Sequence, residues 1–300
     1  MTLITVPCGV CGGAAFEPLY SGTIPADNSD PPDYFSSSRV KAGYLPVVCC
    51  VQCGLVMTNP RDDDATLKRV YAVLEDNVYA AEDDNRRRTA EEHLALVTKH
   101  QQRPARLLDV GCATGAFVSV AQVAGWQTTG LEASAWAVAR ARKRCPQASF
   151  TVGLLEEADF PAASFEVITL WDVLEHVRSP QETLQRVHGW LAPGGWLFLN
   201  LPNADSLVAR LMGRHWVLLL REHLWYFSPT TIGLLLHQNG FELISTRPNF
   251  VRFSATNIFG RLGQYPGVVG RFGRHMMRWR ELKNLSLKFP IGEMNVVAKS

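Results

Sequence analysis

Short apolar runs alternate with longer amphipathic segments from residue 105 to the end of the chain. Ser134, Ser179 and Ser228 precede three of the amphipathic segments, and serine is a common N-cap of helices. The apolar runs have the length of buried strands, which we expect at 106–110, 127–132, 149–152, 165–171, 196–201, 241–246 and 295–299. Strands that alternate with helices predict an α/β fold, with a mainly parallel, seven-stranded sheet covered by helices on both faces.

The chain before residue 104 has a different pattern. Residues 1–60 hold five of the seven cysteines, and residues 21–38 are rich in Ser, Pro and Asp, which indicates a long loop. Residues 61–103 are highly charged, with apolar positions at helical spacing. We therefore expect three parts: a cysteine-rich region at 1–60, a helical linker or cap at 61–103, and an α/β domain at 104–300.

Composition and charge exclude several classes of protein. Apolar residues make up 47% and charged residues 19% of the chain, which is typical of globular proteins rather than disordered or fibrous ones. The formal net charge of +2 creates no strong field for binding nucleic acid. No apolar run approaches the ~18 residues of a membrane span, and the first residues lack the pattern of a signal peptide. We therefore expect a cytoplasmic protein, in which cysteines are thiols or metal ligands.

A loop of small residues joins the first strand of the α/β part to its first helix. The loop contains Gly111, Ala113 and Gly115, which let the backbone come close to a ligand, and the helix start offers free N–H groups. Glu132 ends the next strand, where an acid in nucleotide-binding α/β folds accepts both ribose hydroxyls. The third glycine of the dinucleotide fingerprint is missing, which disfavours an NAD-dependent oxidoreductase. The alternative is a tight turn without a ligand.

Two C-x-x-C-G knuckles lie near the N-terminus. Cys8 and Cys11 form the first, and Cys50 and Cys53 form the second. Four thiolates make a closed tetrahedral site for a structural Zn²⁺ ion, so we expect all four to be metal ligands. The alternatives are two unrelated turns with free thiols, or a redox dithiol. The remaining cysteines are a spare thiol and two small buried residues, namely Cys49, Cys112 and Cys145.

The loop that follows Asp109 resembles the first motif of the class I S-adenosylmethionine-dependent methyltransferases. Residues 165–177, the turn at 193–195 and residues 223–241 are similar to later segments of the same family, in the same order. The resemblance implies a Rossmann-like methyltransferase fold. Zinc knuckles ahead of such a domain are similar to those of sugar C-methyltransferases and related bacterial enzymes of biosynthesis.

The resemblance also implies which residues bind the cofactor. Asp109 would lie near the methionine amino group, Glu132 would hold the ribose, and Trp171 would border the methionine end. The full set implied for the cofactor is Asp109, Gly111, Cys112, Ala113, Gly115, Glu132, Ala133, Leu155, Trp171 and Asp172.

Methyl transfer to oxygen or carbon can require a base, and two histidines are placed for that role. His176 follows the fourth strand, near the cofactor's methionine end. His223 precedes the aromatic residues 225–227, which we expect to wall an acceptor pocket, with Tyr226 as a further catalytic candidate. The alternative for both histidines is packing. The apolar segment 203–221 is interpreted as a pocket roof or a core helix.

Residues 252–288 carry eight basic residues and one acidic residue. We interpret 252–290 as a basic, lid-like insertion, and 252–288 as a contact with a membrane surface or a lipid-linked acceptor. A solvated basic helix, an anionic substrate and RNA are the alternatives.

We therefore expect an S-adenosylmethionine-dependent methyltransferase with a structural Zn²⁺ ion. The expected acceptor is a small molecule, such as a sugar or a nucleotide-linked or lipid-linked intermediate of a biosynthetic pathway. An RNA methyltransferase is the first alternative, but residues 1–60 lack a basic surface with interleaved aromatic residues, and we expect no nucleic-acid partner. The second alternative is a non-catalytic zinc-ribbon protein built on a nucleotide-binding fold.

Overall fold

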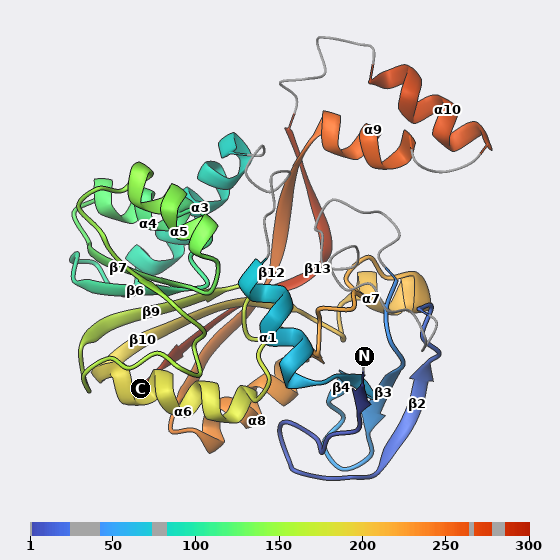
Figure 1. Cartoon of the computed structure of the whole chain (residues 1–300), viewed down its shortest axis with the longest axis horizontal. Coiled ribbons are helices and arrows are strands. Elements are labelled where there is room, and N and C mark those ends of the chain that lie inside the picture. Colours follow the sequence, from blue (N-terminus) through green and yellow to red (C-terminus); the bar gives the residue numbers. More distant parts are fainter. Residues whose placement is uncertain (1, 25–42, 74–82, 264–266, 278–285) are drawn as a thin grey trace.

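The structure is a computed structural model of the chain, and it describes residues 2–24, 43–73, 83–263, 267–277 and 286–300 (Figure 1). Most of the loop expected at 21–38 lies outside these residues. Within the described parts of the chain, no helix combines the length and the apolar character that crossing a bilayer requires.

A seven-stranded sheet forms the centre of the larger part, which confirms the expected Rossmann-like fold. Its strand order is β12-β13-β10-β9-β6-β7-β8, and β13 alone runs antiparallel to the other six strands. The bounds are β6 (Arg106–Val110), β7 (Gln127–Glu132), β8 (Ser149–Val152), β9 (Phe165–Trp171), β10 (Leu191–Pro202), β12 (Glu242–Ser254) and β13 (Ser286–Lys299).

Helices cover both faces of this sheet (Figure 1). One face carries α3 (Asp83–His100), α4 (Ala116–Val123) and α5 (Ala135–Arg144), and the other carries α6 (Pro180–Trp190) and α8 (Pro229–Gln238). Because successive strand residues point to opposite faces, Leu107 packs in the hydrophobic cluster with α3, and Leu108 packs in the cluster with α6. The expected N-caps Ser134, Ser179 and Ser228 each accept a backbone N–H, which confirms these helix starts.

The N-terminal residues form a small sheet that includes a strand from the larger part. Its order is β11-β4-β3-β2, and β11 (Trp225–Tyr226) pairs with β4 (Val56–Thr58). The other strands are β2 (Phe16–Tyr20) and β3 (Val47–Cys50), and a separate pair joins β1 (Leu3–Ile4) to β5 (Arg61–Asp62). Cys8 and Met57 belong to the same hydrophobic cluster as the α6 side of the central sheet. Residues 1–60 therefore share a sheet and a core with the methyltransferase-like part.

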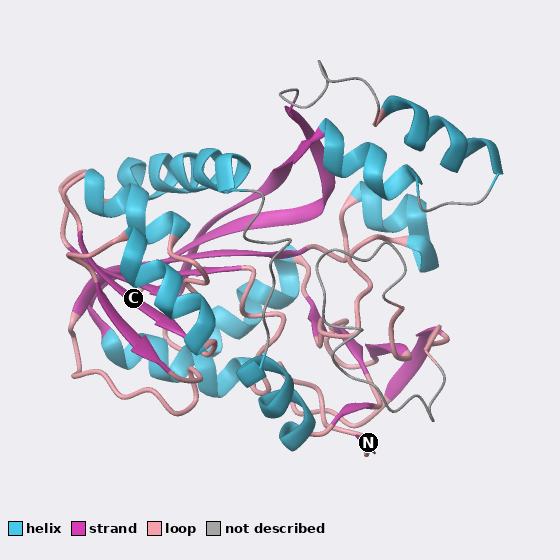
Figure 2. Cartoon of the chain, turned by 45° about the horizontal axis from the view of Figure 1, so that its top comes forward, coloured by secondary structure: helices cyan, strands magenta, loops and turns pink. Residues whose placement is uncertain are grey.

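Several elements differ from the expected ones. The linker at 61–103 begins with β5 and continues into α1 (Asp64–Val73) before α3. The strands expected at 241–246 and 295–299 are longer, because β12 and β13 stay paired out to Ser254 and Ser286. This ribbon runs away from the sheet and carries α9 (Ala255–Gly263) and α10 (Gly267–Met276) at its far end (Figures 1 and 2).

The apolar segment 203–221 is not one long core helix. It contains α7 (Leu207–Met212) and a 3₁₀ turn (Gly213–His215), and the rest of it is irregular. Leu207 and Leu211 are exposed, whereas Trp216 packs with Tyr44 and Tyr226 beside the N-terminal sheet. The segment therefore joins the two sheets.

Candidate cofactor and acceptor site

The loop between β6 and α4 has the geometry of a ligand cradle. Gly111 has φ 69°, and a Cβ atom there would come within 2.5 Å of Val173 Cγ2, so the backbone position excludes a larger residue. Asp109 is buried, and its Oδ1 accepts a 2.8 Å hydrogen bond from Thr169 Oγ1. Burial raises the pKa of the Asp109 carboxyl to about 7.

Glu132 lies at the carboxyl end of β7, and its carboxylate closes this loop. Its Oε2 accepts from the Ala113 N–H at 2.9 Å, and its Oε1 accepts from the Ser134 N–H at 2.9 Å. Burial raises the pKa of Glu132, and these backbone donors oppose the rise. Two backbone hydrogen bonds hold the carboxylate at the loop, which fits the ribose-binding role that the family resemblance implies.

Four other residues expected at the cofactor differ in what they contact: Cys112, Leu155, Trp171 and Asp172. Cys112 is buried beside Gly130, where a Cβ atom would come within 2.7 Å of its sulfur, so its side chain packs in the core. Leu155 is buried as well. Trp171 stacks on His93 of α3 with ring centroids 3.8 Å apart, and Asp172 follows it with a left-handed φ of 56°.

The two histidines expected to be catalytic candidates lie side by side. The ring centroids of His176 and His223 are 4.7 Å apart in an edge-to-face arrangement. His176 Nδ1 lies 3.0 Å from the Glu222 carbonyl, and His223 Nδ1 lies 2.8 Å from the Leu218 carbonyl. A ring nitrogen beside a carbonyl carries the proton, so Nε2 is the basic atom of each neutral ring.

Burial keeps both rings uncharged. It lowers the pKa of His176 to about 4, and burial together with His176 lowers the pKa of His223 well below its ordinary value. Glu175 is also buried, and the ligand-type atoms of Glu175, His176 and His223 lie within 4.8 Å of one another. One carboxylate and two imidazoles form a donor set of the kind that can hold a divalent cation.

The N-terminal sheet holds the segment that contains His223. Thr58 Oγ1 donates to the His223 carbonyl at 2.8 Å, and the Thr58 N–H donates to the Leu224 carbonyl at 3.0 Å. Asp62 and Arg221 form a buried ion pair beside these contacts. Tyr226 is fully buried, and its hydroxyl lies 3.3 Å from the Leu220 carbonyl. The catalytic role expected of Tyr226 stays a prediction, and its burial favours a positioning role.

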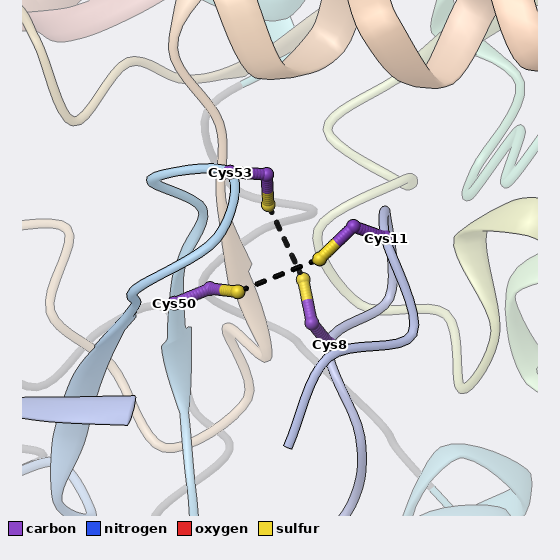
Figure 3. Close-up of side chains that lie close together, drawn as sticks. All are labelled: Cys8, Cys11, Cys50 and Cys53. Atoms are coloured by element: carbon purple, nitrogen blue, oxygen red, sulfur yellow. Dashed lines mark hydrogen bonds between the residues drawn. The ribbon is translucent and has the colours of Figure 1, made fainter. Parts of the chain in front are cut away.

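The four knuckle cysteines converge (Figure 3). The sulfur atoms of Cys8 and Cys53 are 3.5 Å apart, as are those of Cys11 and Cys50, and all four lie within 4.8 Å of one another. A tetrahedral site with Zn–S bonds of ~2.3 Å places its sulfur atoms about 3.8 Å apart, so the four thiols fit Zn²⁺. A disulfide bond has an S–S distance of ~2.05 Å, and the sulfur atoms of both pairs are much farther apart.

Hydrogen bonds within the second knuckle favour the thiolate form of Cys50. Burial raises the pKa of Cys8 to about 11. Burial acts to raise the pKa of Cys50, but hydrogen bonds from the N–H groups of Cys53 and Gln52 and from the thiols of Cys11 and Cys8 together outweigh it and lower this pKa to about 7. Metal binding would therefore release protons from the remaining thiols. Cys49 lies outside the group of four, and Cys112 and Cys145 are buried, as expected.

A family model described as a methyltransferase domain matches residues 79–246, a range that contains the cofactor loop, Glu132 and both histidines. The chain belongs to this methyltransferase family. The expected class of S-adenosylmethionine-dependent methyltransferase is thereby confirmed, whereas the acceptor stays a prediction.

Individual relatives match the same part of this methyltransferase. It is 26% identical over 149 residues to a ubiquinone biosynthesis O-methyltransferase of Thiobacillus denitrificans, and the match covers 46% of this chain and 64% of that protein. It is 32% identical over 149 residues to an uncharacterised methyltransferase of Synechocystis, with 46% and 68% covered. The chain thus spans less than two thirds of the ubiquinone-pathway relative.

Solved structures share the fold. A SAM-dependent methyltransferase of Archaeoglobus fulgidus superposes with a TM-score of 0.51 at 16% identity, over 75% of this chain and 100% of that one. At this identity the likeness concerns the fold alone.

Three polar residues beside the candidate site were not predicted from the sequence. Glu175 directly precedes His176, and its Oε2 has no hydrogen-bond partner within the described part of the chain. Asn200 and Glu293 lie on β10 and β13 and bond to each other next to Asp172. Each is a polar residue within or next to an apolar run, which is the signal that could have identified them.

Proposed function

We propose that this protein transfers a methyl group from S-adenosylmethionine to a small-molecule acceptor of a biosynthetic pathway, such as a sugar or a nucleotide-linked or lipid-linked intermediate. The observation that carries the proposal is the glycine loop closed by Glu132, in a chain of the methyltransferase family. S-adenosylmethionine supplies a methyl group already activated on a sulfonium. The protein therefore has to hold the cofactor, orient the acceptor and remove a proton.

Different residues bind the cofactor and remove the proton. Glu132 binds the ribose hydroxyls, and Gly111 lets the loop backbone lie against the cofactor. His223 accepts a proton from the acceptor at Nε2, because its Nδ1 is committed to the Leu218 carbonyl. His176 contacts the same ring and helps to fix its orientation.

Labelled S-adenosylmethionine and a cell extract test the proposed reaction. Mass spectrometry of the labelled product identifies the acceptor, and a protein or RNA product contradicts the proposal. With that acceptor, His223→Ala should lower kcat about 10²–10⁴-fold without a change in cofactor affinity. If His176→Ala alone abolishes turnover at unchanged cofactor affinity, the base is His176.

We also propose that Cys8, Cys11, Cys50 and Cys53 hold one structural Zn²⁺ ion. The convergence of the four sulfur atoms supports this proposal. Metal analysis should find one equivalent of zinc, and a Cys8→Ser/Cys53→Ser variant should lose it. Cys49→Ser is the matched control, because this thiol lies outside the group of four, and it should retain the metal. Metal-free protein with full activity would contradict the proposal.

The ribbon of β12 and β13 is proposed to bring the enzyme to anionic lipid that presents the acceptor. Helix α10 exposes Val268 and Phe272, and Arg271 and Arg274 on the same helix are exposed as well. Exposed apolar side chains interleaved with arginines favour a lipid surface with negative headgroups. Other basic residues expected in this contact, at 278–283, lie outside the described residues.

Sedimentation with vesicles tests this contact. The enzyme should sediment with phosphatidylglycerol vesicles and not with phosphatidylcholine vesicles, and Val268→Ser/Phe272→Ser should abolish the binding. Val123→Ser is the control, because Val123 is 89% exposed on α4, away from the ribbon. Equal sedimentation of the double variant would rule out this surface.

A further inference from the structure

Thr58 lies against the stretch of chain that contains the proposed base. It is the last residue of β4, and its side chain is fully buried. Its hydroxyl donates to the His223 carbonyl at 2.8 Å, and its N–H donates to the Leu224 carbonyl at 3.0 Å. The proposed function gives Thr58 no role, although it contacts the backbone of the base from the N-terminal sheet.

The same stretch is also bonded to the segment that contains the second histidine. The Leu224 N–H donates to the Glu175 carbonyl at 2.8 Å, and the Trp225 ring N–H donates to the Val177 carbonyl at 2.7 Å. Glu175 and Val177 are the two sequence neighbours of that histidine. The stretch is therefore bonded both to the methyltransferase domain and to Thr58.

One peptide group, between His223 and Leu224, is held at both of its polar atoms. Its oxygen accepts from the Thr58 hydroxyl, and its N–H donates to the Glu175 carbonyl. A peptide group is planar, so two hydrogen bonds on its opposite edges fix the orientation of the whole plane. The Cα atom of His223 lies in this plane and is fixed with it.

The ring of His223 takes its direction from this backbone. Its Nδ1 lies 2.8 Å from the Leu218 carbonyl, and the His223 N–H donates to the Leu220 carbonyl at 3.2 Å. Both bonds lie within residues 218–223, so they fix the ring relative to its own loop. The peptide group held by Thr58 fixes the end of that loop relative to the rest of the protein. Both sets of bonds together place Nε2.

The hairpin that carries Thr58 also carries the second cysteine knuckle. β4 pairs with β3 on one side and with β11 on the other, and the Cys50 N–H donates to the Leu55 carbonyl at 2.8 Å across the turn. The first knuckle reaches the same stretch, because a Cβ atom at Gly9 would come within 2.8 Å of the Trp225 ring. The cysteine-rich region therefore packs against the backbone around the proposed base.

Packing alone does not require a hydroxyl at position 58. Valine favours strands and differs from threonine mainly by a methyl group in place of the hydroxyl, but here that methyl group would face the His223 carbonyl. A buried carbonyl that loses its donor is unfavourable, and the backbone moves to find another partner. The hydroxyl of Thr58 therefore keeps this carbonyl in one position.

We propose that Thr58 is a positioning residue for His223: its hydroxyl fixes the peptide group after the base, and with it the direction of Nε2 toward the methyl acceptor. The inference rests on the proposed function, because it takes His223 as the base. It assigns the N-terminal region to the acceptor side of the active site. The matched family model begins at residue 79, so this contribution comes from outside the family domain.

NMR of the full chain, labelled with ¹⁵N-histidine and saturated with S-adenosylhomocysteine, tests the inference. Long-range ¹H–¹⁵N spectra report which ring nitrogen carries the proton, and the signal missing from His223→Gln identifies the base. In the unmodified protein this ring should be a single tautomer protonated at Nδ1. Thr58→Val should give a mixture of both tautomers, and Thr58→Ser, which keeps the hydroxyl, should restore the single tautomer.

Tyr44→Phe is the matched control. It removes a hydroxyl that donates to the Arg214 carbonyl at 3.0 Å, away from the stretch around His223, and it should leave the His223 signal unchanged. Thr58→Ala removes the hydroxyl without placing a methyl group against the carbonyl, so it provides the same test if Thr58→Val fails to fold. An unchanged His223 signal in the folded variant, or an equal change in Tyr44→Phe, would overturn the inference.

Turnover adds a second readout once labelling has identified the methyl acceptor. Thr58→Val should lower kcat at least about tenfold, because a small misplacement of a reacting group can cost about 10²-fold, whereas the affinity for S-adenosylhomocysteine should stay the same. A parallel loss of cofactor affinity would mean general disruption and would overturn the positioning role.

Cofactor binding separates the two failures. Calorimetry that finds no S-adenosylhomocysteine binding to the unmodified protein refutes the proposed function. Normal cofactor binding, together with a His223 ring that does not respond to loss of the Thr58 hydroxyl, leaves the methyltransferase intact and refutes the positioning role alone.

Discussion

Removal of one partner of the buried ion pair between Asp62 and Arg221 should destabilise the protein strongly. Arg221 Nε lies 2.6 Å from Asp62 Oδ2, and Arg221 Nη2 lies 2.7 Å from Asp62 Oδ1, which is a two-point contact. The two side chains are only 2% and 1% exposed. Asp62→Ala would leave a buried guanidinium without its counter-charge, and such a loss costs about 3–5 kcal/mol.

Urea unfolding followed by tryptophan fluorescence measures this cost. The free energy of unfolding should fall by about 3–5 kcal/mol in Asp62→Ala, which is a large part of the ~5–15 kcal/mol of a typical protein. Asp62→Leu/Arg221→Met should recover most of the loss, because it removes both buried charges.

An exposed pair provides the comparison. Arg210 and Asp205 lie 3.3 Å apart and are 67% and 53% exposed, so Asp205→Ala should cost less than about 1 kcal/mol. A loss below about 1 kcal/mol in Asp62→Ala would refute the reasoning, since it would mean that water or another group compensates Arg221.

Further predictions concern the cofactor loop and a buried histidine. Gly111→Ala should weaken S-adenosylmethionine binding more than tenfold in calorimetry, because its Cβ would meet Val173 at 2.5 Å, whereas Gly153→Ala, with no atom within 4 Å, should bind normally. Glu132→Ala should weaken S-adenosylmethionine binding at least tenfold, because hydrogen bonds to a charged acceptor contribute about 1.5–3 kcal/mol each. Unchanged affinity would contradict the role of Glu132 in binding the ribose. Burial lowers the pKa of His93 from 6.5 to about 4, so the unfolded chain binds a proton that the folded chain excludes between these values. Stability should therefore fall by about 3 kcal/mol as pH drops from 6.5 to 4, relative to His93→Phe, in urea unfolding at each pH, and a constant difference would contradict the shift.

Local signals in the sequence predicted much of the fold and the cofactor loop. Ser134 and Gly111 act within a few residues of their own positions, as an N-cap and as a left-handed turn, so their neighbours in the sequence suffice to identify them. Glu132 could be predicted because it ends the strand next to the one that carries the cofactor loop, and that strand end has a fixed position in nucleotide-binding α/β sheets.

Features that depend on distant pairings could not be predicted. Asn200 and Glu293 meet only because β13 runs antiparallel beside β10 in one register, which periodicity does not specify. The aromatic neighbours of Tyr226 indicated a pocket wall, but β11 pairs with β4 and buries that ring. The length of β12 likewise depends on its pairing with β13 beyond the core.

The pairing of β11 with β4 has a consequence for folding during synthesis. Met57 pairs with Trp225, which is made 225 − 57 = 168 residues later. At ~5–20 residues per second, the edge of the N-terminal sheet remains without its final strand for roughly 10–30 s. An unpaired strand edge can join another chain. A metal ion bound early at the cysteine knuckles would keep this edge ordered on the ribosome until its partner strand arrives.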